Sequence, residues 1–289
     1  MSETGTTVER VERVHAHGPA LALLWFMVLA LTAVAIAAVT SLLWGGSRPV
    51  LAALVGVAPT PLGVWLVWRA AGPVAVRTLF RRVLRWRFAP VYYVIALCIA
   101  PAVNLLGQVL ALGTGEPGPD RWLLSPTDAL SPHLLGLIPI IVLTEIGWRG
   151  VALPAAMISL GSVAGALMIG VAEGLWALGM VMLGAADLPR LGIVAVLLSA
   201  LVWSPTWAFL TQRTDGSLLA TILFHLSVVY WADVTPVDRV GSGMALLLYG
   251  VLGVAAALML PRPRFRPLIE GIGLRSRAIR VAGRWRSPA

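Results

Sequence analysis

The sequence predicts an all-α protein, a polytopic transmembrane helical bundle of about eight spans. Of its 289 residues, 58% are hydrophobic and only 12% are charged, whereas soluble domains have about 45–50% apolar and about 25% charged residues. The mean hydropathy is +0.87. Apolar runs of about 20 residues, the length that crosses a bilayer, recur along the chain. Much of the surface of this protein must therefore face lipid and not water.

The apolar runs predict eight spans joined by connections that are mostly short. In order, they are residues 19–43, 50–72, 90–112, 133–157, 160–184, 191–211, 217–234 and 241–260. The first run is too long for the apolar part of a signal peptide and lacks a clear cleavage site, so we expect a retained span. The predicted organisation is a polar tail over 1–18, a membrane domain over 19–260 and an Arg-rich tail over 261–289.

Arginine sets the predicted orientation, because the chain has no lysine and its net charge is +9. The two large Arg clusters lie at 77–87, after the second span, and in the C-terminal tail. Eight spans place both clusters and the N-terminus on one side, which the positive-inside rule makes cytoplasmic. We expect a multi-pass protein of the plasma membrane with both termini in the cytoplasm. Arginines placed between apolar runs do not indicate nucleic-acid binding.

Four ionisable residues inside the predicted spans are the candidate site: Glu145, Arg149, Glu173 and His225. Charged groups within a bilayer are costly and are functional candidates by default. Glu145 and Arg149 are spaced i,i+4, so a purely structural ion pair is one interpretation. Glu173 has no basic residue within a turn, so it must find a partner on another helix, face a cavity or be protonated. His225 is either a packing residue or part of a shared polar site.

Glycines at four-residue spacing mark the fifth span, at Gly161/Gly165 and Gly170/Gly174. This small-xxx-small pattern allows neighbouring helices to approach closely. Cys98 is the only cysteine and lies in an apolar run, which excludes an intrachain disulfide.

The segment around Glu145 resembles the first motif of the CPBP family. These are intramembrane proteases related to type II CAAX-processing endopeptidases and to bacteriocin-immunity (Abi) proteins. Residues 144–154 read Thr-Glu-Ile-Gly-Trp-Arg-Gly-Val-Ala-Leu-Pro, against a family pattern of Glu-Glu-x-x-x-Arg. Residues 174–176 resemble the second motif, Phe-x-x-x-His, and 211–225 resemble the lead-in to the third, His-x-x-x-Asn. The resemblance covers roughly 75–235 and implies an eight-span protease fold.

The sequence departs from the family pattern at the positions that would carry the chemistry. Thr144 stands where the family has its proposed water-activating Glu, Ala177 where it has a His, and Val229 where it has an Asn. Hydrolysis of a peptide needs a base to activate water and donors to stabilise the oxyanion. The Thr144 hydroxyl cannot serve as that base, and Ala177 and Val229 have no polar side-chain atom. The family positions that remain filled are Glu145, Arg149 and His225, and Glu173 stands at the Phe of the second motif.

These departures predict a catalytically impaired CPBP/CAAX-protease-like protein, a pseudoprotease that binds a hydrophobic or prenylated peptide or a membrane protein. An active endopeptidase with a rearranged site, in which Glu173 partners His225, is the first alternative. A transporter that uses the buried carboxylates and imidazole as relay groups is the second alternative, although no inverted repeat is visible.

The candidate residues do not make up a metal site. A metal would keep at most His225 and one carboxylate, fewer than the usual three protein ligands, so we expect no metal and no cofactor.

Overall fold

The computed structural model describes residues 3–44, 48–116, 132–184, 192–235 and 239–260, and within these ranges all regular structure is helical. The all-α polytopic bundle predicted from composition is therefore confirmed. The Arg-rich tail over 261–289 lies outside the described residues. In chain order, the elements are α1 (Glu3–Trp44), α2 (Arg48–Val57), α3 (Pro59–Ala71), α4 (Pro73–Arg81), α5 (Pro90–Leu112), α7 (Pro132–Gly147), the π-helix η1 (Trp148–Ala152), α8 (Leu153–Leu160), α9 (Ser162–Met182), α10 (Gly192–Arg213), α11 (Leu218–Val234) and α12 (Arg239–Leu258).

Among the described residues, seven helical segments are long and apolar enough to cross a membrane. They correspond to seven of the eight predicted spans, the second being built from α2 and α3 and the fourth from α7, η1 and α8. The remaining predicted span, 217–234, is the shorter apolar helix α11. Its 17 residues extend about 26 Å at 1.5 Å per residue, slightly less than the bilayer hydrocarbon core of about 30 Å.

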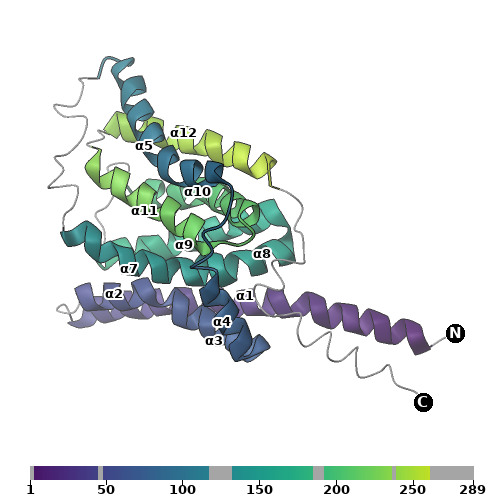
Figure 1. Cartoon of the computed structure of the whole chain (residues 1–289). Coiled ribbons are helices and arrows are strands. Elements are labelled where there is room, and N and C mark those ends of the chain that lie inside the picture. Colours follow the sequence, from purple (N-terminus) through teal and green to yellow (C-terminus); the bar gives the residue numbers. More distant parts are fainter. Residues whose placement is uncertain (1–2, 45–47, 117–131, 185–191, 236–238, 261–289) are drawn as a thin grey trace.

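The helices pack in layers, with the candidate site in the middle. Helices α1, α2 and α3 form one side of the bundle and α5 and α12 the other, with α7 to α11 between them (Figure 1). Helix α9 packs between α8 and α10, while α11 packs between α5 and α7. Helices η1, α9 and α11, which carry three of the candidate residues, therefore have neighbouring helices on both sides.

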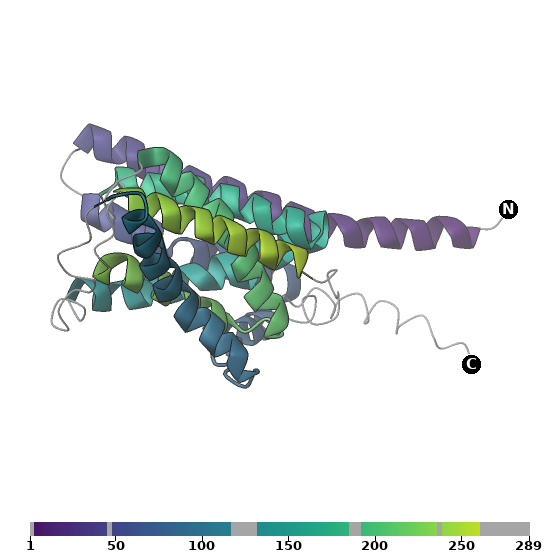
Figure 2. The same ribbon diagram turned by 90° about the horizontal axis from the view of Figure 1, so that it is seen from above.

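Helix α1 extends well beyond the rest of the bundle (Figures 1 and 2). It has 42 residues, or about 63 Å of helix, roughly twice the hydrocarbon thickness of a bilayer. Residues 3–18, predicted as a polar tail, therefore continue the helix of the first span. Only the apolar segment Ala20–Leu43 has the composition of a span.

At one end of the bundle, the loop after the second predicted span meets the start of the seventh, and the loop after the sixth meets the end of the eighth. Ser217 Oγ donates a hydrogen bond to Arg85 O (2.6 Å), and Arg213 Nη2 donates one to Met259 O (3.3 Å). The N-terminal end of α1 and the C-terminal end of α12 also point to the same side in both views (Figures 1 and 2). This arrangement is the one that an even number of crossings, with α11 as one of them, would give.

Glycine permits the closest helix contacts in the middle layer. A Cβ added at Gly165 would lie 2.6 Å from the carbonyl carbon of Ala156 on α8, and one at Gly170 would lie 2.9 Å from the Cα of Leu201 on α10. Both positions belong to the predicted small-xxx-small pattern, which therefore joins α9 to its neighbours on two sides.

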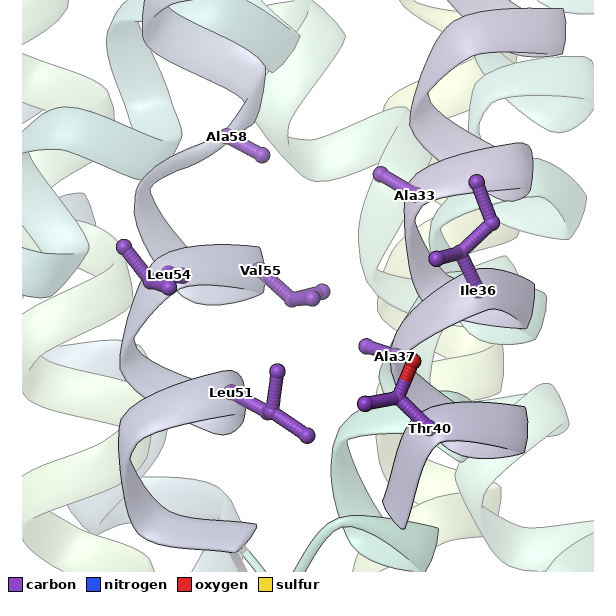
Figure 3. A pocket seen from close by; sticks show the side chains of 8 residues that line it. All are labelled: Ala33, Ile36, Ala37, Thr40, Leu51, Leu54, Val55 and Ala58. Carbon is purple, nitrogen blue, oxygen red and sulfur yellow. The ribbon is translucent and has the colours of Figure 1, made fainter. Parts of the chain in front are cut away.

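An apolar groove of about 340 Å³ lies between α1 and α2. Its lining is hydrocarbon apart from one hydroxyl, as Figure 3 shows; the lining residues are Ala33, Ile36, Ala37, Thr40, Leu51, Leu54, Val55 and Ala58. None of the four candidate residues lines it. The groove is therefore separate from the polar site.

Candidate functional site

The first two site residues lie on either side of a break in helical geometry. Glu145 lies in the last turn of α7, and Arg149 is the second residue of the π-helix η1. The π-register is visible in the N–H of Leu153, which donates to Trp148 O, five residues earlier. Pro154 then provides no N–H at all. Single π-turns of this kind are frequent at functional sites.

Arg149 is fully buried and is bound by a carboxylate from the neighbouring span. Its Nη1 and Nη2 donate to Oε1 and Oε2 of Glu173 on α9, and the Nη2–Oε2 distance is 2.6 Å. The two parallel bonds form the bidentate geometry in which Arg binds carboxylates most specifically. Glu173, which has no basic residue near it in sequence, therefore finds its partner on another helix.

Glu145 is also fully buried, and one of its oxygens contacts two partners. Its Oε1 lies 2.7 Å from Nδ1 of His225 on α11 and 3.3 Å from Nη1 of Arg149. An ionised carboxylate only accepts, so the imidazole hydrogen belongs on Nδ1, and Nε2 of a neutral imidazole is left as an acceptor. The His225 side chain is 19% exposed and is the least enclosed of the four. The i,i+4 ion pair predicted between Glu145 and Arg149 is confirmed.

An indole forms one wall of the site. The guanidinium carbon of Arg149 lies 3.9 Å from the ring centroid of Trp207 on α10, close enough for a cation–π interaction. The Trp207 ring also packs edge-to-face with the His225 ring, with centroids 5.4 Å apart. One aromatic side chain thus orients the cation and the imidazole together.

All four predicted residues converge through direct contacts, from η1, α7, α9 and α11. Their pairing differs from the rearranged protease site considered above, in which Glu173 would partner His225. Instead, Glu173 binds Arg149, and the imidazole binds Glu145.

The position of the family's proposed water-activating Glu is occupied by a hydroxyl that faces backbone. Thr144 Oγ1 lies 2.9 Å from Gly56 O and 2.8 Å from Ile140 O. One turn along, a Cβ added at Gly147 would lie 2.2 Å from Pro59 O. Helix α7 therefore packs closely against the α2–α3 junction at this face, and the hydrogen bond of Thr144 to Gly56 O stabilises that contact.

The other two departures place hydrocarbon near the site. Ala177, one turn after Glu173 on α9, packs against the large core cluster. Val229 lies one turn after His225 on α11 and is half-buried. Within the described part of the chain, no three His, Cys, Asp or Glu side chains are arranged to hold a metal ion.

Two site atoms have no hydrogen-bond partner among the described residues. They are Oε2 of Glu145 and Nε of Arg149, both buried. A buried polar atom left without a partner costs about 1–3 kcal/mol. The site is thus saturated along the Glu173–Arg149–Glu145–His225 chain but retains one unused acceptor and one unused donor at its centre.

Arg82 belongs to the arginine cluster at 77–87, which in the sequence indicates only the orientation of the protein in the membrane. It is only 5% exposed, and its guanidinium donates to Gly216 O (2.7 Å), Gly150 O (2.8 Å) and, weakly, Arg149 O (3.5 Å). Burial, assisted by the positive charge of Arg85, lowers the pKa of Arg82 to about 10, so it is charged at neutral pH. A basic cluster in a loop is an ordinary topology signal, and nothing in its spacing singled out this residue.

The fold and this buried Glu–Arg–Glu–His chain define an integral, polytopic helical membrane protein with an ionisable site between its spans. Residues 126–231 match the family model described as Rce1-like, type II CAAX prenyl endopeptidase Rce1-like. The resemblance to the CPBP-type family that the motifs indicate is therefore confirmed over this stretch, which contains all four site residues. No curated protein matches the chain.

Proposed function

We propose that this protein is a CPBP-like membrane protein that binds a hydrophobic or prenylated peptide, or a membrane protein partner, without cutting it. The observation that supports the proposal is that the guanidinium fork and the imidazole are already paired with carboxylates inside the site. Both nitrogen arms of the Arg149 fork are taken by Glu173, and the imidazole is held by Glu145. The prenyl endopeptidase named in the family model motivates the choice of a prenylated peptide.

The chemistry of hydrolysis explains why this pairing matters. A general base must lie within hydrogen-bonding reach of the water it activates, and the oxyanion needs donors that are free to receive it. Here the hydroxyl of Thr144 faces carbonyl oxygens of the backbone. Ala177 and Val229 have no polar atom to offer. Under this proposal, the protein keeps the scaffold of a protease, and the ionisable groups of the site hold its helices together.

A working endopeptidase is the second candidate, and one contact favours it. Glu145 orients the imidazole of His225 through Nδ1, as a carboxylate does in hydrolytic sites with a His base. The Nε2 atom would then be the one that accepts a proton from water. In this version Glu145, and not Glu173, is the partner of the base.

A single experiment separates these two functions. The full-length protein in lipid vesicles is given a fluorogenic farnesylated peptide, and cleavage and binding are both measured. We expect saturable binding of the farnesylated peptide, weaker binding of the same peptide without its prenyl group, and no cleavage above protein-free vesicles.

The variants His225→Gln and Glu145→Gln decide the alternative. Cleavage by the wild type that falls by about 10²–10⁴-fold in either variant, the usual loss for a general base, would establish the endopeptidase. Binding no stronger than to protein-free vesicles would refute the proposed binding function.

We further propose a location in the plasma membrane with both termini cytoplasmic and no requirement for a metal or cofactor. The Arg-rich loop meets the start of α11, and the end of α10 meets the end of α12. These contacts support a common side, and the positive-inside rule makes that side cytoplasmic. Cysteine labelling of Ser2→Cys and Ala289→Cys in a Cys98→Ala background, with intact cells, tests the location of the termini. Labelling of either by an impermeant reagent would contradict it.

A further inference from the structure

Arg82 is an unusual buried cation, because the described residues give its guanidinium no carboxylate partner. Its partners are instead backbone carbonyl groups on two separate segments, Gly216 after α10 and Gly150 within η1. Gly216 has a left-handed φ of +79°, and a Cβ there would lie 3.2 Å from Nη2 of Arg82. Glycine thus leaves the space that the guanidinium occupies.

Pro154, which follows the π-turn, explains why a carbonyl oxygen of η1 is available for Arg82. In an α-helix the carbonyl of residue 150 would accept from the N–H of residue 154, and in a π-helix the carbonyl of residue 149 would do so. Residue 154 is Pro, which has no N–H. Arg82 supplies donors to both carbonyls, at 2.8 Å for Gly150 and 3.5 Å for Arg149.

The same loop also holds the start of α11, the helix that carries His225. The N–H of Leu218 donates to Arg82 O (3.0 Å), and Ser217 Oγ donates to Arg85 O (2.6 Å). Ser217 is also the N-cap of α11 and accepts from the N–H of Ala220. Residues 82–85 therefore contact both chain segments that must be aligned for the site to form.

We propose that Arg82 is a positioning residue that fixes the π-turn of Arg149 relative to α11 and thereby sets the Glu145–His225 contact. Its side chain supplies donors to η1 that Pro154 withholds, and its own carbonyl anchors α11. The role holds whether the site binds or cleaves a peptide, so its test does not depend on the proposed function. Arg82 lies outside residues 126–231, the stretch that matches the family model.

The proposal is tested through the ¹⁵N NMR signals of the His225 imidazole, which are few to assign because the chain has only four histidines. In protein labelled with ¹⁵N-histidine and held in detergent micelles, His225→Gln identifies the His225 signals. We expect Arg82→Gln to move the Nδ1 signal of His225 towards those of the remaining histidines, because its bond to Glu145 is weakened. Arg81→Gln, an exposed arginine at the adjacent position, is the matched control and should leave it unchanged.

A second background tests the mechanism through Pro154. Pro154→Ala restores an N–H that can donate to η1, so Arg82→Gln should move the His225 signal less in that background than alone. If Arg82→Gln yields no folded protein, Arg82→Lys is measured instead. Its compact ammonium cannot reproduce the planar fork, and it should give a partial shift of the same sign.

Two results would overturn the proposal. One is a His225 signal that stays at its wild-type position in the Arg82 variant, even if the melting temperature falls, since Arg82 would then be only a structural residue. The other is an equal movement in Arg81→Gln, which would reflect a general effect of loop charge.

Discussion

Among the described residues, the centre of the bundle and its arginine-rich end each bury one guanidinium, and they satisfy it in different ways. Arg149 lies between two carboxylates, with bidentate bonds to Glu173 and a 3.3 Å contact to Glu145. Arg82 is bound by backbone carbonyl oxygens of two turns. A buried charge costs several kcal/mol unless it is compensated. The central cation receives full opposite charges, whereas oriented dipoles serve at the end of the bundle, outside the predicted spans.

The largest effect should follow from removing the central cation. Arg149→Met leaves the carboxylates of Glu173 and Glu145 buried without it, and breaking a buried pair in this way costs about 3–5 kcal/mol. Unfolding free energies measured in mixed micelles of increasing SDS content should fall by that amount, and Arg77→Met, at an exposed arginine, should change little. Equal losses of unfolding free energy in the two variants would mean that the buried arginine contributes no more to stability than an exposed one.

Removing the opposite charge together with the cation should recover part of that loss. In Arg149→Met/Glu173→Leu no unpaired charge remains at that contact, and residues in direct contact typically show coupling energies of about 0.5–3 kcal/mol. We expect the double variant to be more stable than Arg149→Met alone. Strictly additive losses would mean that the two side chains do not depend on each other.

A smaller loss is expected at the end of the bundle. Arg82→Gln removes charge-assisted hydrogen bonds, each worth about 1.5–3 kcal/mol, but Gln retains one donor, so we expect a net loss of about 1.5–3 kcal/mol. Burial lowers the pKa of Arg82 to about 10 from 12.5, so the unfolded state binds more protons only between those values. Stability from this group therefore rises with pH only in that window.

The loss in Arg82→Gln should accordingly be the same at about pH 6 and about pH 8, with Arg81→Gln measured beside it. A loss that changes between these pH values, or one as large as that of Arg149→Met, would mean that dipoles do not suffice to hold this cation.

The smallest effect should come from the wall of the central site. Trp207→Phe keeps a ring near Arg149 but weakens the cation–π interaction, which is worth about 0.5–2 kcal/mol. We expect a loss of less than about 1 kcal/mol in the same unfolding assay. Trp65→Phe, at an indole that is 47% exposed, is the control. A loss exceeding that of Arg82→Gln would show that stacking, more than charge, holds Arg149.

Much of the fold could be predicted because its signal is local. Each span is an uninterrupted apolar run, and seven of the eight predicted runs are membrane-length segments in the structure. The continuation of α1 through residues 3–18 was not predicted, because polar composition is compatible with both a tail and a helix. The sequence also predicts a span at 217–234, whereas the structure shows there the shorter apolar helix α11.

The candidate site could be predicted as a set but not as a pattern of pairs. An ionisable residue in an apolar run is conspicuous in any sequence, and so Glu145, Arg149, Glu173 and His225 were all found. Which carboxylate binds the guanidinium depends on how α9 is rotated against η1. That rotation is set by contacts such as Gly165 on Ala156 and Gly170 on Leu201, whose geometry no spacing specifies.

The sequence by itself determined a helical membrane bundle, the residues that must be shielded from lipid and the three departures from the family motifs, because hydropathy and motif spacing are properties of contiguous residues. Only the tertiary structure decided that Glu173 binds Arg149, that Glu145 binds His225 and that Arg82 lies buried against the π-turn. The physical reason is that a buried charge is stabilised by whichever partner packing brings within about 3 Å, and packing joins residues far apart in the chain.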